Sequence, residues 1–384
     1  MLIAAHIIAD DLTGLLEAVQ SLAITDVRIQ ISPEHSSRKH TDSPRLVNAN
    51  IRDAKSADAL DIIRRLTRDI PEESYLFLKI DSLLRGPIKS MIMGLRELQR
   101  PIIFAPATPG RQRTTRDLKM YVNDVPLKQS GTWNIETTTP PESLEEVLVG
   151  NEYGHLPISA IRREPHILAS AIQEQVSQNS VIACDAESSI DLDRIALATR
   201  SLKPRPVFVG SAGLLSSLRS HWFPPARHKE LELPPAEYQK PILFILGSAA
   251  STTFAQYKSI DREGLVIYDD ALSGASMRAS FANSEDLIVP PRAKTDAKGR
   301  EARQNELEKI VRRVPPLYKT LFMTGGETAF RVLALLGVTK LRCIGFADSG
   351  LAVMKDNKNR SIIIKPGEYG QTDLLNMVRR AGAT

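Results

Sequence analysis

Apolar, β-rich segments recur along this chain, and each is followed by a segment with helical periodicity. At 2–9, LIAAHIIA precedes GLLEAVQSLA, and at 74–80, SYLFLKI precedes PIKSMIMGLRELQ. Strands that are apolar at nearly every position are typical of parallel sheets covered by helices on both faces. The alternation therefore predicts an α/β fold with a mostly parallel sheet flanked by helices.

A segment rich in proline and charge interrupts this alternation. Residues 223–241, FPPARHKELELPPAEYQKP, lack periodic apolar positions, which is typical of a linker. We place a domain boundary near residue 235, so that 1–235 and 236–384 form two domains, each with its own sheet. A chain of 384 residues is long enough for two such cores, and we expect the active site in the interdomain cleft.

Composition narrows the class of protein only in part. With 42% apolar and 25% charged residues, the chain is typical of soluble globular proteins. Its net charge of +5 fits an anionic small substrate as well as nucleic acid. Cys184 and Cys343 follow apolar stretches, so we expect buried thiols and a cytoplasmic protein rather than a secreted disulfide framework. The start, MLIAAHIIADD, predicts neither a signal peptide nor a membrane span.

Polar side chains gather just after the predicted strands of the first domain, where open α/β sheets bind ligands. Carboxylates accept protons from hydroxyls, and arginines bind carboxylate or phosphate through two parallel hydrogen bonds. The pattern therefore predicts a site for a small hydroxylated acid. Its candidate residues are Asp10, Asp11, Thr13, Gly14, Arg52, Asp53, Asp81, Ser82, Arg85, Gly86, Pro109, Gly110, Arg111 and Arg113.

These residues also have an interpretation that needs no ligand. Asp11 could be only the N-cap of the first helix, because an acid after a strand is often a cap. Lys79 and Asp81 could form a surface ion pair that contributes little to stability. Arg111 and Arg113 could merely solvate a loop.

Glycine turns follow the predicted strands of the second domain. Such turns expose backbone N–H groups, and helix N-termini attract phosphate. No GxxxxGK[ST] occurs and no GxGxxG follows the first strand, so neither a P-loop NTPase nor a dinucleotide fold is predicted. Three glycine turns in one domain instead predict a nucleotide site of another type, with candidate residues Gly247, Ser248, Gly325, Gly326, Glu327, Thr328, Gly367 and Gly370.

Other chemistries lack support in the sequence. The seven histidines are scattered, and no carboxylate or cysteine cluster completes a zinc site, so no residue is assigned to a metal. No GxSxG elbow occurs. Basic residues do not cluster with aromatic ones, which disfavours nucleic-acid binding.

Taken together, these motifs resemble those of the four-carbon acid sugar kinases. The matching segments, in order, are ADDLTG at 9–14, KIDSLLRG at 79–86, RTT at 113–115, DAESSIDL at 185–192, VGSAGL at 209–214, GSAASTTFAQ at 247–256, TGGETA at 324–329 and KPGEYG at 365–370. The resemblance implies ATP-dependent phosphorylation of the terminal hydroxyl of threonate, erythronate or 3-oxotetronate. It also implies an acid-binding N-terminal domain and an ATP-binding C-terminal domain.

The resemblance also implies roles for individual residues. The implied substrate contacts are Asp10, Asp11, Arg52, Lys79, Ile80, Asp81, Ser82, Arg85 and Arg113. The implied nucleotide contacts are the glycine-turn residues above together with Lys365. We expect Arg52 and Arg85 to bind the substrate carboxylate and Asp11 or Asp81 to accept the hydroxyl proton, which makes Asp81, Asp11 and Arg85 the catalytic candidates. Expected partners are ATP with Mg²⁺, the sugar acid and a second copy of the chain, but neither nucleic acid nor membrane.

Several positions depart from the family pattern. Gln112 stands where the family has glycine before RTT, and Asp117 and Leu118 replace a glycine pair. The other departures are Glu17 for aspartate, Met120 for histidine, Phe346 for glutamate, Ser349 for proline and KPGEYG for KPGGFG. The alternative function is therefore a catalytically impaired paralogue that binds a sugar acid or nucleotide as a sensor. Another α/β enzyme, such as an isomerase or aldolase for a phosphorylated sugar acid, is a weaker alternative.

Overall fold

The chain divides into two compact units in a computed structural model. The N-terminal unit comprises Met1–Leu22 and Ser32–Leu231, and the C-terminal unit comprises Ala23–Ile31 and Glu232–Thr384. The predicted boundary near residue 235, and most of the predicted linker, lie outside the described residues. The structure describes residues 4–33, 44–133, 138–150, 152–222, 237–269, 276, 279, 282–283, 285–293, 297–313, 318–347 and 349–382.

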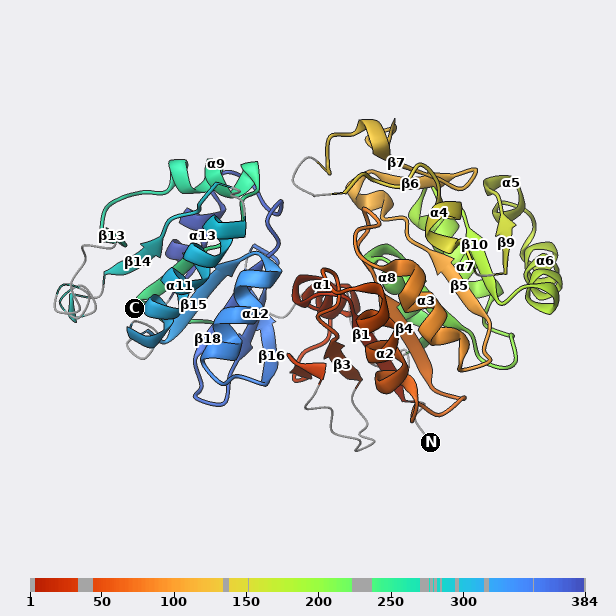
Figure 1. Ribbon diagram of the computed structural model, residues 1–384, viewed down its shortest axis with the longest axis horizontal. Coiled ribbons are helices and arrows are strands. Elements are labelled where there is room, and N and C mark those ends of the chain that lie inside the picture. Colours follow the sequence, from red (N-terminus) through yellow and green to blue (C-terminus); the bar gives the residue numbers. More distant parts are fainter. Residues whose placement is uncertain are drawn as a thin grey trace. The chain divides into compact units, whose positions relative to one another are not determined.

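A parallel sheet forms the centre of the N-terminal unit (Figure 1). Its strands pair in the order β3-β1-β4-β11-β5-β10-β9, and every neighbouring pair is parallel. The predicted α/β fold is confirmed. The strands are β1 (Ala5–Ala9), β3 (Arg45–Asn48), β4 (Tyr75–Lys79), β5 (Ile102–Ala105), β9 (Tyr153–Leu156), β10 (Val181–Cys184) and β11 (Val207–Gly210).

Helices cover both faces of this sheet. On β4, Leu76 and Leu78 join the core cluster beneath α2 and α3, whereas Phe77 points the other way and contacts Trp222 of α8. Both faces are therefore apolar, which explains why β1 and β4 are hydrophobic almost without interruption. The helices are α1 (Leu12–Leu22), α2 (Ser56–Thr67), α3 (Ile88–Arg96), α4 (Leu144–Leu148), α5 (Ile158–Ile161), α6 (Pro165–Gln178), α7 (Ser189–Ala198) and α8 (Ala212–Trp222).

The strand register aligns the carboxyl ends of the central strands. Ala9 pairs with both Asn48 and Lys79, and Gly210 pairs with both Lys79 and Ala105. The loops that follow these strands therefore begin side by side at one edge of the sheet. This edge is where parallel α/β sheets place their ligand sites.

A small antiparallel sheet follows β5. It contains β6 (Arg113–Arg116), β7 (Lys119–Val122) and β8 (Val125–Pro126), between the 3-10 helices η2 (Pro109–Arg111) and η3 (Leu127–Gln129). The predicted loop at 109–116 is therefore partly a strand, because its backbone pairs with β7.

The C-terminal unit has a mixed sheet. The strands run in the order β13-β14-β12-β15-β18-β17-β16-β2, parallel from β13 to β18 and antiparallel from β18 to β2. The strands are β2 (Arg28–Gln30), β12 (Ile242–Leu246), β13 (Leu265–Ile267), β14 (Asp286–Val289), β15 (Thr320–Thr324), β16 (Lys340–Phe346), β17 (Ala352–Lys355) and β18 (Ser361–Lys365).

The parallel part of this sheet repeats the alignment of strand ends. Leu246 pairs with Thr324, and Thr324 pairs with Lys365, so the turns after β12, β15 and β18 begin at one edge. The helices of this unit are α9 (Ser251–Ser259), α11 (Ala297–Arg313), α12 (Gly326–Leu335) and α13 (Leu374–Ala381). Tyr238, Phe244 and Phe322 belong to its core.

Cys184 and Cys343 are buried free thiols, as the sequence predicts. Burial raises the pKa of the Cys343 thiol to about 11, so this cysteine is a core residue rather than a reactive one. In the described part of the chain, no helix combines the length and apolar character needed to cross a membrane.

Candidate functional site

Asp10 and Arg52 form a fully satisfied fork at the end of β1. Arg52 Nε donates to Asp10 Oδ2 at 3.0 Å and Nη2 donates to Asp10 Oδ1 at 2.9 Å. The Asp81 backbone N–H also donates to Asp10 Oδ2, at 3.2 Å. Asp10 is completely buried, and burial raises its pKa although Arg52 opposes the shift. Asp10 therefore joins the ends of β1 and β4 and has no surface to offer a ligand.

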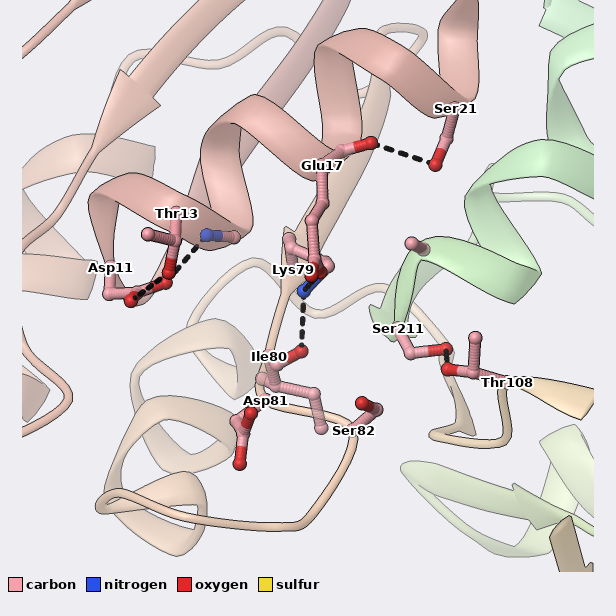
Figure 2. A network of polar contacts seen from close by, with 12 residues as sticks. Asp11, Thr13, Glu17, Ser21, Lys79, Ile80, Asp81, Ser82, Thr108 and Ser211 are labelled. Carbon is pink, nitrogen blue, oxygen red and sulfur yellow. Dashed lines mark hydrogen bonds and ion pairs between the residues drawn. The ribbon is translucent and has the colours of Figure 1, made fainter. Parts of the chain in front are cut away.

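Asp11 accepts hydrogen bonds on both of its carboxylate oxygens. Its Oδ1 accepts the Gly14 N–H at 2.6 Å, so Asp11 is the N-cap of α1, and this interpretation is confirmed. Its Oδ2 accepts from Thr13 Oγ1 at 2.6 Å and from Arg52 Nη1 at 2.7 Å. Arg52 thus relieves the repulsion between the adjacent carboxylates of Asp10 and Asp11. Figure 2 shows the cap and Thr13 at the start of α1.

Asp81 and Arg85 form a second fork in the loop after β4. Arg85 Nε donates to Asp81 Oδ2 at 2.6 Å and Nη2 donates to Asp81 Oδ1 at 2.9 Å. Arg52 Nη2 lies 4.0 Å from Asp81 Oδ1, which links the two forks into one network. Burial would raise the pKa of Asp81, but Arg85 and Arg52 hold it well below its usual range. Asp81 is therefore a weak proton acceptor in this arrangement. We refer to Asp10, Asp11, Arg52, Asp81 and Arg85 as the carboxylate–guanidinium cluster.

Lys79 lies beside this cluster and is almost completely buried. Its Nζ donates to the Ile80 carbonyl at 3.0 Å and lies 3.1 Å from Glu17 Oε2 (Figure 2). Glu17 Oε1 accepts from Arg111 Nη1 at 2.8 Å. Burial favours the neutral Glu17 carboxyl, but Lys79 and Arg111 hold its pKa below the usual value. The glutamate thus links α1, the end of β4 and the turn after β5.

Arg113 differs from Arg52, Lys79, Arg85 and Arg111, each of which forms an ion pair with a carboxylate. Its Nη1 donates to the Ser82 hydroxyl, and no carboxylate of the described residues forms an ion pair with it. Burial lowers the pKa of Arg113, as expected for a cation that is only partly compensated. A guanidinium of this kind is suited to an anionic ligand.

The hairpin that carries Arg113 keeps the left-handed backbone conformation that glycine favours, although it lacks the glycines of the family pattern. Gln112 (φ 53°), Asp117 (φ 50°) and Leu118 (φ 58°) all adopt left-handed conformations. These are the positions where the family pattern has glycine, so the departures in sequence preserve the shape of the turn. The Asp117 N–H donates to Asp185 Oδ2 at 2.8 Å, and Leu118 packs against the core. Met120, at the histidine position, is buried.

Ser211, which the sequence offered only as part of the VGSAGL segment, directly follows β11 at the same edge of the sheet. Its Oγ donates to the Ala107 carbonyl at 2.5 Å and accepts from Thr108 Oγ1 at 2.7 Å. Glu17 was noted only as a departure from the family, although a glutamate on a helix that is otherwise largely buried is a detectable signal. Asp53 is exposed at the turn after β3. In Figure 2, Ser211 and Thr108 point toward each other beside the β4 loop.

In the C-terminal unit, the three glycine turns meet. A Cβ on Gly247 would lie 2.0 Å from Thr328 Oγ1, one on Gly367 would lie 2.2 Å from Ser248 Oγ, and one on Gly325 would lie 3.5 Å from the Ser248 N and Cβ atoms. Gly325 also has φ 88° and its N–H donates to the Lys365 carbonyl at 3.0 Å. We refer to Gly247, Ser248, Gly325, Thr328 and Gly367 as the glycine-turn cluster.

Other predicted residues of this unit have structural contacts. Glu327 lies in the first turn of α12, which begins at Gly326. Gly370 has φ 85° and approaches Leu374, and Lys365 is completely buried. Tyr369, at one of the departures in this region, donates its Oη to the backbone carbonyl of Ser349 at 3.1 Å. Phe346 is a core residue.

The described residues contain no group of three or more His, Cys, Asp or Glu side chains able to hold a metal ion. Each cluster follows the carboxyl ends of parallel strands, but the two clusters differ in chemistry. The N-terminal cluster offers charged side chains, and the C-terminal cluster offers closely packed backbone.

Comparisons with known proteins match this division. A family model described as a sugar-binding N-terminal domain matches residues 5–218, and one described as a nucleotide-binding C-terminal domain matches residues 243–375. The carboxylate–guanidinium cluster lies within the first match and the glycine-turn cluster within the second.

Curated relatives and solved structures extend the comparison. A D-threonate kinase of Cupriavidus necator is 27% identical over 76% of this chain and 68% of its own length. A D-threonate kinase of Bordetella bronchiseptica is 23% identical over 96% of this chain and 95% of its own. Two crystal structures have the same fold over 98% of this chain and 99% of theirs: one from Salmonella typhimurium LT2 (TM-score 0.77, 15% identity) and the Haemophilus influenzae protein HI1011 (TM-score 0.73, 17% identity).

Proposed function

Because the chain belongs to the four-carbon acid sugar kinase family, we propose that it uses ATP to phosphorylate the terminal hydroxyl of a four-carbon sugar acid. One observation carries the proposal. The carboxylate–guanidinium cluster with Arg113 beside it, and a cluster of glycine turns, each follow the carboxyl ends of parallel strands, within the sugar-binding and nucleotide-binding matches respectively. D-threonate is the first acid to test, since the curated relatives are named for it.

We assign the substrate carboxylate to Arg113 rather than to Arg52 or Arg85. The guanidinium groups of Arg52 and Arg85 already form forks with Asp10 and Asp81. Arg113 donates to the neutral hydroxyl of Ser82, which a carboxylate would replace as the stronger acceptor. Arg52 and Arg85 then act by holding the aspartates in place.

Of the two candidate bases, we propose Asp11. The low pKa of Asp81 makes its carboxylate a poor proton acceptor, and only 8% of its side chain is accessible. Asp11 is partly exposed, with 15% of its side chain accessible, so a hydroxyl can approach it. Phosphoryl transfer depends mainly on positioning and electrostatics, so a modest base is sufficient.

We propose that the ATP phosphates are bound by the first N–H groups of α12, from Gly326 to Thr328, and by the Gly367 N–H, because the N–H groups of Gly247, Ser248 and Gly325 already donate to Thr324 and Lys365. Mg²⁺ bound to ATP would neutralise charge on the transferred group. No described cluster of acidic, histidine or cysteine side chains forms a preformed metal site, which fits an ion held chiefly by nucleotide phosphates and water. The chain's own part is to fix the phosphates in one geometry.

A substrate-panel kinase assay tests the proposal. Purified protein is incubated with Mg·ATP and, separately, D-threonate, L-threonate, D-erythronate, L-erythronate or a 3-oxotetronate, and ADP release is measured beside product mass. We expect turnover with at least one acid and none with the corresponding neutral tetritol. Binding of acid and nucleotide without turnover would instead support the impaired sensor, and no binding of any nucleotide would refute the kinase.

A further inference from the structure

Lys365, the last residue of β18, is surrounded by the carbonyls of the loop that follows it. Its Nζ donates to the carbonyl oxygens of Pro366 at 2.9 Å, Gly367 at 2.7 Å and Tyr369 at 3.2 Å. The side chain is 0% exposed. Its amine therefore lies on the interior side of the loop 366–371, not on the side that faces solvent.

Two side chains of α9 bind the same loop from the same interior side. Thr253 Oγ1 donates to the Gly367 carbonyl at 3.0 Å. Gln256 Nε2 donates to the carbonyls of Tyr369 at 3.0 Å, Gly370 at 3.3 Å and Gln371 at 2.9 Å. Thr253 and Gln256 are both 0% exposed, so these donors and Lys365 form one buried cage around the loop carbonyls.

The planarity of the peptide bond fixes the other side of the loop. In a trans peptide the C=O of one residue and the N–H of the next point in opposite directions. Carbonyls drawn toward Lys365 and α9 therefore turn the N–H groups of Gly367, Glu368, Gly370 and Gln371 away from the cage. None of these four N–H groups has a hydrogen-bond partner among the residues that the structure describes, whereas the Tyr369 N–H donates to the Pro366 carbonyl at 3.1 Å.

We propose that Lys365 is a positioning residue that holds the loop 366–371 with its carbonyls inward and its N–H groups outward, ready to bind a nucleotide phosphate. Gly367 lies against Ser248, so the outward N–H groups adjoin the glycine-turn cluster. The inference rests on the proposed kinase function and deepens it. This positioning role replaces the direct nucleotide contact that we expected of Lys365, because the ammonium group of Lys365 already binds three carbonyls inside the protein.

Hydrogen exchange with ADP as the probe tests the proposal on the full chain. Free, outward N–H groups exchange quickly, and a bound phosphate protects them. We expect ADP to slow exchange in the peptide covering 366–372 of the wild-type protein. ADP binding that leaves this peptide unprotected would overturn the inference while leaving the kinase proposal intact, and a wild-type protein that binds no nucleotide would overturn both.

Lys365→Met supplies the decisive variant, with Lys355→Met as its matched control. Lys355 Nζ also binds a carbonyl of its own turn, that of Asn359 at 3.3 Å, but at the opposite end of β18. Because hydrogen bonds to a charged donor are among the strongest, we expect Lys365→Met to weaken ADP binding by about tenfold or more and to abolish loop protection. Lys355→Met should bind as the wild type does. Equal ADP binding by both variants would refute the role of Lys365.

Two further measurements apply even if Lys365→Met fails to fold. Thr253→Val removes one neutral donor of the cage and keeps the side-chain shape, so ADP binding should weaken by a smaller factor than in Lys365→Met. Unchanged binding would count against the cage.

The second measurement is the pH dependence of ADP binding. Burial lowers the pKa of Lys365 to about 7, and Glu368 opposes this shift. Wild-type affinity for ADP should then fall as pH rises from about 6 to about 8, beyond any change in Lys365→Arg, whose guanidinium stays charged. Glu368 and Tyr369, the other titratable groups of the loop, are common to both proteins.

Discussion

The two candidate sites occupy the same position in their sheets, yet they are built from different parts of the chain. In the N-terminal unit, charged side chains after β1, β3 and β4 bind one another through forks, and the backbone only sets their spacing. In the C-terminal unit, glycine turns after β12, β15 and β18 lie so close together that a methyl added to Gly247 or Gly367 would collide with a neighbour. The first site is organised by charge, and the second by the absence of side chains.

This difference has a physical reason. A small acid with several hydroxyls is distinguished by the placement of charged groups and acceptors, which only side chains supply in sufficient variety. A nucleotide phosphate is the same in every nucleotide, and uniform backbone N–H groups with helix N-termini suit it. Substitutions should therefore affect the two sites in different ways: removal of charge should damage the first, and added volume should damage the second.

The largest effect is expected from Arg52→Met. The change leaves the buried carboxylate of Asp10 and the partly exposed carboxylate of Asp11 without their shared cation, and loss of one partner of a buried pair costs about 3–5 kcal/mol of unfolding free energy. Denaturant unfolding monitored on the N-terminal unit measures it. Arg64→Met is the matched control, because the Arg64–Glu97 pair is exposed and should contribute less than about 1 kcal/mol. Equal losses in both variants would contradict an organisation of the first site by charge.

Arg113→Met tests whether the N-terminal site binds the acid, and not ATP, through the guanidinium of Arg113. Loss of a charge-assisted hydrogen bond of about 1.5–3 kcal/mol should raise the KM for the acid roughly 10- to 100-fold and leave the KM for ATP unchanged. Steady-state kinetics with each substrate varied in turn measures both constants. Arg116→Met serves as the control on the same hairpin, since Arg116 is exposed and pairs with Glu187. If ATP binding suffered as much as acid binding, the assignment of Arg113 to the carboxylate would be wrong.

Gly247→Ala tests the close packing of the glycine-turn cluster, because it adds one methyl group and changes no charge. Its Cβ would lie 2.0 Å from Thr328 Oγ1 and 2.4 Å from Thr328 Cβ, so the turn must shift, and overpacking of this kind costs about 1–3 kcal/mol. We expect weakened ADP binding in calorimetry with unchanged binding of the acid. Gly110→Ala, where no atom lies within 4 Å of the added carbon, should leave both unchanged. A Gly247→Ala protein with normal ADP affinity would show that close packing of the glycine turns is not required.

A smaller effect, on the free energy of unfolding at acid pH, is expected for the carboxylate–guanidinium cluster. The pKa of Asp81 is lower in the folded than in the unfolded chain, so Asp81 contributes stability above its unfolded pKa of 3.8 and loses this contribution as the pH falls further. The stability difference between wild type and Asp81→Asn should therefore shrink between about pH 5 and pH 2. Asp61→Asn, at an exposed position, is the control variant and is unfolded over the same pH range. A constant difference for Asp81→Asn would contradict the ionised fork.

The sequence predicted the parts of this molecule that depend on local order. Apolar strands with polar residues at their ends predicted the α/β fold and the strand edge where Asp10 and Asp81 lie. The sequence also allowed the prediction that Asp11 is the N-cap of the first helix. The contact of Glu17 with Arg111 could not be predicted, because residues 94 positions apart meet only once β5 has joined the same sheet as β1 and β4, with β11 between β4 and β5. The inward orientation of Lys365 was equally hidden, since a lysine beside glycines is just as compatible with a direct phosphate contact.

The hairpin shows a further limit of motif reading, and it leads to the prediction with the smallest expected effect. Loss of glycine at 112, 117 and 118 pointed to altered loops, yet all three residues keep positive φ angles. A left-handed conformation costs a residue other than glycine about 1 kcal/mol, and glycine loses more entropy on folding, so the two effects nearly cancel. Gln112→Gly should change the unfolding free energy by less than about 1 kcal/mol and turnover by less than about twofold. A large gain in activity, measured with the preferred acid, would show that Gln112 restrains the Arg113 hairpin, and the preserved backbone would then not be equivalent to the glycine form.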